Sequence, residues 1–104
     1  MIKAVFYKSK NNYYGFEISG HSGYAERGND IVCASVSALI LHTARILSEE
    51  FEVVEFFEQN DKGWLKLKMK STDEITDMLI KRLIETLRDI QEEYSGYLLV
   101  EVKE

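Results

Sequence analysis

The only cysteine of this 104-residue chain, Cys33, lies twelve residues after one of its two histidines, His21. A thiolate is a strong nucleophile, and an imidazole can take up and return a proton near neutral pH. The pair could therefore attack a carbonyl carbon and then protonate a leaving amine. A cysteine in an apolar segment is more often a buried side chain without chemistry, so spacing alone leaves both interpretations open.

The residues around Cys33 indicate how a reactive thiol would be positioned. Asp30 is a good helix N-cap, which places Cys33 at the third position of a helix that begins near Ile31. The helix dipole and the free amides of a first turn favour a thiolate, and they could also stabilise an oxyanion. Because a carboxylate close to the sulfur would oppose this effect, we expect Asp30 to face backbone amides or the imidazole of His21.

The loop that joins the two residues is rich in glycine, with Gly20, Gly23 and Gly28 within nine positions. Glycine permits a left-handed backbone, and it also suits a loop that moves over a substrate. If this loop doubles back, His21 and Cys33 meet.

The rest of the chain predicts the elements that would hold this loop. Alternating apolar and polar residues indicate strands, and apolar residues three or four apart indicate helices. The predicted strands cover residues 2–8, 13–19, 53–58, 64–70 and 97–103, and the predicted helices cover 31–51 and a segment from about 71 to 96. The fold class is therefore α+β, a single domain over residues 1–104 in the order β-β-α-β-β-α-β, with about five strands in one sheet and two helices packed on it.

The two predicted helices differ in their apolar patterns. The first is apolar on nearly every side, which implies that its own domain or a second subunit covers more than one face. The second is expected to begin at a capping box formed by Ser71 and Glu74 and to end at Gly96. Its apolar stripe is Ile75, Leu79, Leu83, Leu87, Ile90 and Tyr94.

Composition limits the classes of function. The net charge of −5 repels nucleic acid, and a single cysteine cannot form a disulfide within the chain, which fits a reducing cytoplasm. We find no leader pattern and no uninterrupted apolar segment long enough to span a bilayer, so we expect a cytoplasmic protein without a membrane partner.

One segment favours a different function. Trp64, Lys66, Lys68 and Lys70 alternate along the fourth predicted strand and could contact RNA, as in a non-catalytic ribosome- or RNA-associated binding module. The simpler interpretation is a solvated face that discourages edge pairing, and the acidic net charge favours it. We therefore expect no direct nucleic-acid partner.

A metal site is the third alternative. His21, Asp30, Cys33 and Glu26 could supply mixed ligands to zinc, but one cysteine and one histidine at irregular spacing are few strong ligands. Thiolate chemistry needs no cofactor, so we expect none.

The segment "GHSGYAERGNDIVCASVSAL" resembles the signature of the ribosomal-processing cysteine proteases, the Prp family. The signature joins Gly-His and a small residue, across a short loop, to Gly-x-Asp-x-Val-Cys-Ala and a later serine. The matching residues are Gly20, His21, Ser22, Gly28, Asp30, Val32, Cys33, Ala34 and Ser37. Length and element order also fit, so the resemblance extends from end to end.

The resemblance implies a function that the residues alone do not. Prp enzymes remove an N-terminal extension from a basic large-subunit ribosomal protein, they cut after an aromatic residue, and they are homodimers of α+β fold. By position, Cys33 would be the nucleophile and His21 its proton-transfer partner. Asp30 and Ser37 match family positions of less settled role, and Ser37, one helical turn after Cys33, could hydrogen-bond near the sulfur. Gly20 and Gly28 belong to the same motif.

Overall fold

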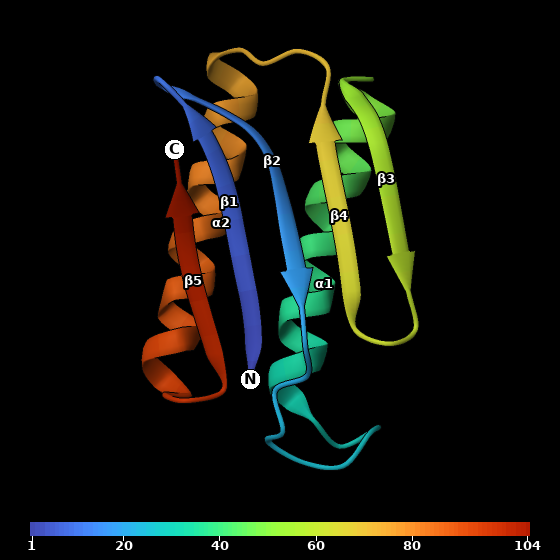
Figure 1. Ribbon diagram of the computed structural model, residues 1–104, viewed down its shortest axis with the longest axis vertical. Helices are drawn as coiled ribbons and strands as arrows, with labels where there is room; N and C mark the ends of the chain where they lie inside the picture. The colour runs from blue at the N-terminus through green and yellow to red at the C-terminus, as the bar shows by residue number, and fades with distance from the viewer.

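Two hairpins and one crossover strand form a five-stranded sheet in the computed structural model, which describes residues 1–104 (Figure 1). The order across the sheet is β3-β4-β2-β1-β5, with β1 and β5 parallel and the other neighbours antiparallel. The α+β fold and the element order predicted from the sequence are confirmed. The strands are β1 (Ile2–Ser9), β2 (Asn12–Ser19), β3 (Val54–Asn60), β4 (Trp64–Met69) and β5 (Leu98–Lys103), and the helices are α1 (Ile31–Arg45) and α2 (Glu74–Glu93).

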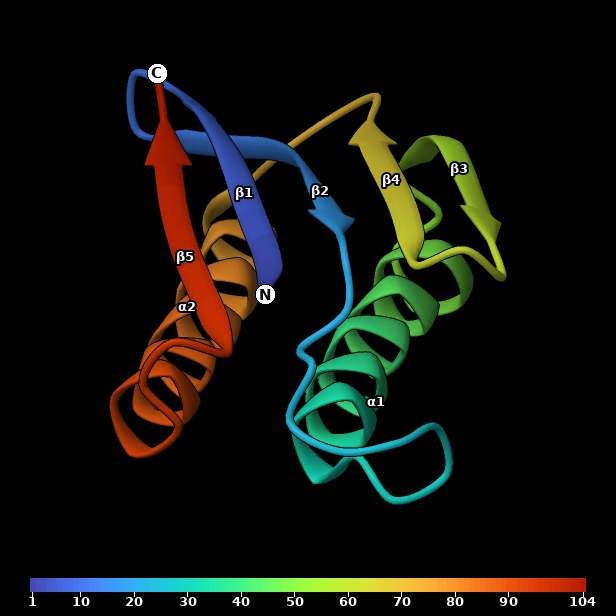
Figure 2. The ribbon, with the colours of Figure 1, turned by 60° about the horizontal axis from the view of Figure 1, so that its bottom comes forward.

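Both helices pack on the same face of the sheet, and the core lies between them and the strands (Figure 2). Phe6, Phe16 and Leu67 are directly opposite one another on β1, β2 and β4, and all three are almost fully buried. Leu65, Leu67 and Met69, which alternate with Trp64 and the lysines along β4, are buried, as the alternation of a strand requires.

Helix α1 ends six residues earlier than predicted. It changes at Ile46 into one π-helical turn, Ile46–Glu50, in which the amide of Phe51 donates to the carbonyl of Ile46 at 3.2 Å. Glu52 then takes a positive φ of 51°, which stops any helical continuation. Leu47 remains fully buried in this wider turn, so the segment stays attached to the core.

The segment Ile31–Glu50 is long enough and apolar enough to cross a membrane, with a mean hydropathy of 1.7. This finding differs from our expectation that no segment is long enough. In the fold it lies against the sheet, where Val32, Val36, Ile40 and Leu47 enter the core. The core helix of a globular domain has the same composition, so this hydropathy is weak evidence for a membrane span. Ile31 and Leu41 remain 49% and 42% exposed, so the chain alone does not cover every apolar side of α1.

Helix α2 begins at a different capping box from the predicted one. The Asp73 carboxylate accepts from the amide of Thr76 at 2.8 Å, and the Thr76 hydroxyl accepts from the amide of Asp73 at 3.0 Å. The prediction of Ser71 and Glu74 was wrong by two residues because both pairs have the same spacing. The buried face is correspondingly Thr76, Ile80, Leu83, Ile84 and Leu87, while Ile75 is 53% exposed.

Candidate active site

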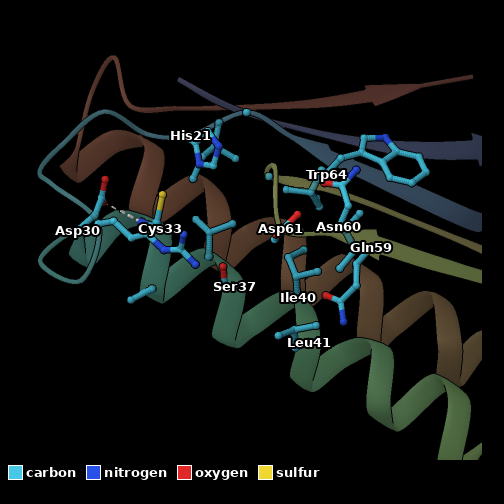
Figure 3. A pocket seen from close by; sticks show the side chains of 18 of the residues that line it. His21, Asp30, Cys33, Ser37, Ile40, Leu41, Gln59, Asn60, Asp61 and Trp64 are labelled. Carbon is cyan, nitrogen blue, oxygen red and sulfur yellow. Dashed lines mark hydrogen bonds between the residues drawn. The ribbon is translucent and has the colours of Figure 1, made fainter.

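Cys33 is the third residue of α1, and its backbone is held by the N-cap of that helix. One carboxylate oxygen of Asp30, Oδ1, accepts a hydrogen bond from the amide of Cys33 at 2.9 Å (Figure 3). The predicted N-cap is therefore confirmed. The same bond occupies the amide of Cys33, so this amide is not free to meet an oxyanion, contrary to what the first-turn position suggested.

Ser22 folds back from the loop onto the sulfur. Its amide donates to Cys33 Sγ at 3.4 Å. The thiol of Cys33 in turn donates to the Ser22 hydroxyl at 3.6 Å. The hydroxyl in turn donates to Asp30 Oδ2, and Ser22 is only 3% exposed. The sequence singled out Ser37 as the serine near the sulfur, but Ser37 makes no hydrogen bond to Cys33, and Ser22 takes that place.

These donors determine the charge of Asp30. Its pKa is lowered from 3.8 to about 2, chiefly by the hydrogen bond from the Ser22 hydroxyl and then by the amide of Cys33. The carboxylate therefore stays ionised further into the acid range than an ordinary aspartate does. We expected Asp30 to face either backbone amides or the imidazole of His21. It accepts from the amides of Ala25 and Cys33, and it makes no hydrogen bond to His21.

His21 lies immediately after β2, where Gly20 turns the chain out of the sheet. The φ of Gly20 is +89°, and a Cβ atom there would lie 2.5 Å from the carbonyl oxygen of Met1, so glycine is required twice over. The amide of Gly20 donates to the carbonyl of Gly63 at 2.8 Å, which connects this turn to the β3–β4 hairpin. The imidazole of His21 is exposed and faces the sulfur of Cys33 across a gap, without a hydrogen bond between them (Figure 3).

An aromatic contact fixes the far side of the loop. The ring of Tyr24 makes edge-to-face contacts with Tyr94 and Tyr97, at centroid distances of 5.4 and 5.2 Å. Its amide donates to the Ser22 hydroxyl at 3.2 Å. The loop is thereby attached both to the end of α2 and to the side chain beside the sulfur.

A cleft of about 770 Å³ brings the predicted site residues together. Cys33, His21, Asp30, Ser37, Gly20 and Gly28 all line it, and Gly28 has a φ of +93° that only a residue without a side chain adopts readily. Sequence reasoning missed one wall, which comes from the β3–β4 hairpin and consists of Gln59, Asn60, Asp61, Gly63 and Trp64. The turn residues Asn60, Asp61 and Gly63 mark that hairpin in the sequence, but they do not show that the hairpin reaches the site.

The lysines of β4 do not form a continuous basic face. The indole of Trp64 donates to Glu17 at 2.7 Å, and the ammonium of Lys68 lies 3.6 Å from the carboxylate of Glu55. Lys66 is flanked in the sheet by Glu17 and Glu58. Acidic residues therefore separate these positive charges. The fold also brings no three His, Cys, Asp or Glu side chains into an arrangement that could hold a metal ion.

The sequence matches a family model described as cysteine protease Prp over residues 1–99. The chain belongs to the Prp family of cysteine proteases. A curated relative, ribosomal processing cysteine protease Prp of Bacillus subtilis (strain 168), is 29% identical over 107 residues, with 96% of each chain covered.

Solved structures share the fold of this chain. The essential ribosomal processing protease Prp of S. aureus, with a covalently linked product peptide, has a TM-score of 0.85 at 19% identity, covering 99% of this chain and all of that one. SMU.848 of Streptococcus mutans has a TM-score of 0.81 at 26% identity, covering 98% and 93%. The Prp fold thus extends over almost the whole chain.

Proposed function

We propose that this chain is an endopeptidase that removes the N-terminal extension of a large-subunit ribosomal protein precursor. In this proposal Cys33 is the nucleophile and His21 its proton-transfer partner. The observation that carries it is their position on one cleft, with the sulfur directed toward the imidazole (Figure 3). The substrate class is supported by the name of the B. subtilis relative and by S. aureus Prp structures that contain a substrate peptide and a product peptide.

The reaction would proceed through a thioester. The thiolate of Cys33 forms a bond to the scissile carbonyl carbon, and the imidazolium of His21 protonates the amide nitrogen as the carbon–nitrogen bond breaks. The amine product leaves, while the extension stays on the sulfur. The now neutral imidazole takes a proton from water, the water oxygen attacks the thioester carbon, and the thiolate departs with the imidazolium restored.

The remaining motif residues support this pair. Asp30 caps α1 and holds the backbone of Cys33, and Ser22 joins its carboxylate to the sulfur. The open gap between His21 and Cys33 is compatible with catalysis, because such contacts often tighten only when substrate is bound. Ser37 lines the cleft one turn after Cys33, where its hydroxyl is available to a bound peptide.

The walls of the cleft favour an extended peptide with an apolar residue at the cleavage point. Ile18, Ile40, Leu41 and Leu65 line it together with Trp64. These apolar side chains form one part of the cleft, which suits a bulky side chain, and we propose cleavage after an aromatic residue. The chain would require no cofactor.

We also propose that this enzyme acts in the cytoplasm and that it forms a homodimer. Dimerisation is supported by apolar side chains outside the cleft that the single chain leaves open, namely Ile31 on α1 and Phe56 and Phe57 on β3, which are each more than 40% exposed. The acidic net charge of −5 suits a basic ribosomal protein as substrate.

The test is cleavage of a precursor peptide that spans the junction between extension and mature protein, followed by mass spectrometry. The wild-type protein should cut once, after an aromatic residue, and Cys33→Ala should leave the fold intact and abolish cleavage. His21→Ala should lower kcat, whereas His42→Ala is a matched control, since His42 is exposed on α1 and lies outside the cleft. Undiminished cleavage by Cys33→Ala would exclude the proposal.

A further inference from the structure

Gly63 lies directly against the imidazole of His21. It occupies the turn between β3 and β4, and its φ is +84°. A Cβ atom at this position would lie 2.8 Å from Cε1 and 2.9 Å from Nε2 of the imidazole. Both distances are shorter than real contacts of a Cβ atom, so any side chain here would displace the ring.

The backbone reinforces this contact. The carbonyl of Gly63 accepts from the amide of Gly20 at 2.8 Å, and a Cβ atom on Gly63 would also lie 2.8 Å from the carbonyl oxygen of Gly20. The turn thus bounds both the imidazole and the residue that precedes it. A substitution could not be accommodated by a rotation of the His21 side chain alone, because one of the contacted atoms belongs to the backbone.

We propose that Gly63 is a positioning residue for the protease reaction. It provides a flat backbone surface against which the imidazole of His21 lies, and the imidazole is thereby directed toward Cys33. This inference rests on the proposed function of His21. The β3–β4 hairpin thus helps to position the imidazole, although it supplies neither the nucleophile nor its proton-transfer partner.

Three glycine variants separate position from backbone strain. Gly63→Ala introduces both the contact and an unfavourable positive φ, whereas Gly63→Asn introduces the same Cβ atom on a residue that tolerates this φ better. Gly96→Ala is the matched control, because Gly96 has a φ of +92° and no atom within 4 Å of a Cβ. Folding of each variant is checked by thermal denaturation.

We expect kcat/KM for the precursor peptide to fall on the order of 10²-fold in Gly63→Ala and Gly63→Asn, as for a catalytic group displaced by about 1 Å. Gly96→Ala should lose thermal stability and keep its kcat/KM. Wild-type kcat/KM in folded Gly63→Asn would overturn the inference.

A second measurement does not require the natural substrate. The rate at which iodoacetamide alkylates Cys33 at pH 6 should fall in both Gly63→Asn and His21→Ala, because the first variant displaces the imidazole and the second removes it. A wild-type rate in Gly63→Asn beside a reduced rate in His21→Ala would also overturn the inference. If the wild-type protein cuts no precursor peptide, the proposed function fails, and the alkylation rates still decide the role of Gly63.

Discussion

Among the side chains of the site, Ser22 makes the connection that most affects how Cys33 is held. Its hydroxyl lies between the sulfur and the carboxylate of Asp30, and it is almost completely buried. The sequence placed Ser22 in the motif without a role, because its neighbours in space depend on how the loop folds back. Asp30, by contrast, could be assigned as a cap from the sequence, since capping is a contact within three residues.

Ser22→Ala should reduce the free energy of unfolding by about 1 kcal/mol, because the buried hydroxyl of Ser22 no longer bonds the partly exposed carboxylate of Asp30. Urea denaturation measures this change. Ser35→Ala is the control, since the hydroxyl of Ser35 bonds to the carbonyl of Ile31 at the exposed surface of the same helix. Equal losses in the two variants would contradict the role given to Ser22.

The carboxylate of Asp30 should make the free energy of unfolding depend on pH in the acid range. Its folded pKa of about 2 is below the unfolded value of 3.8, so the unfolded chain binds more protons in this range. The stabilisation is present above pH 3.8 and is lost as the pH falls toward 2. Asp30→Asn keeps a good N-cap residue and removes the charge.

The melting temperature of Asp30→Asn should therefore lie below that of the wild-type protein at pH 7, and the difference should shrink through the same acid range. Thermal denaturation monitored by circular dichroism across pH measures it. A difference that stays constant from neutral to acid pH would show that the charge of Asp30 does not contribute.

The secondary-structure elements were largely predictable because each has its own local period. The alternation in β4 and the apolar spacing in α2 identified both elements correctly. The start of α2 was misplaced by two residues, since Ser71 with Glu74 and Asp73 with Thr76 offer the same spacing. The choice depends on packing: the observed start buries Thr76 and Ile80 and leaves Ile75 in solvent.

The observed cap makes a direct prediction. Asp73→Ala should lower the free energy of unfolding by about 1 kcal/mol, because the amide of Thr76 loses its acceptor. Ser71→Ala, at the position that the sequence suggested, should change it by less than about 0.5 kcal/mol, as an exposed residue outside the helix. Chemical denaturation of both variants measures this, and a larger effect at Ser71 would contradict the assignment.

Across the molecule, the cleft depends on the order of strands in the sheet. The β3–β4 hairpin reaches the site because β4 pairs with β2, whose end carries Gly20 and His21. Pairing between strands distant in sequence leaves no local pattern, so the wall with Gly63 and Trp64 could not be predicted. The opposite wall comes from the loop and the start of α1, which are adjacent in the chain, so the motif residues His21, Asp30 and Cys33 line it together.

The acidic charge of the whole protein should influence substrate binding. The protein has a net charge of −5. KM for a basic precursor peptide should therefore rise with salt concentration, because salt screens the attraction between the acidic protein and the basic peptide. The value of kcat should change little. Steady-state kinetics at several salt concentrations measures this, and a peptide with glutamine in place of the basic residues serves as control. Identical salt dependence for the two peptides would contradict a role for charge.

The most direct test of the central claim, that the thiol of Cys33 reacts as a partner of His21, is the rate of alkylation of Cys33 as a function of pH. The account predicts that His21→Ala slows alkylation by iodoacetamide near pH 6 and that His42→Ala leaves the whole profile unchanged. A profile that is the same in the wild-type protein and in His21→Ala would contradict it, and Cys33 would then be an ordinary thiol at the start of a core helix.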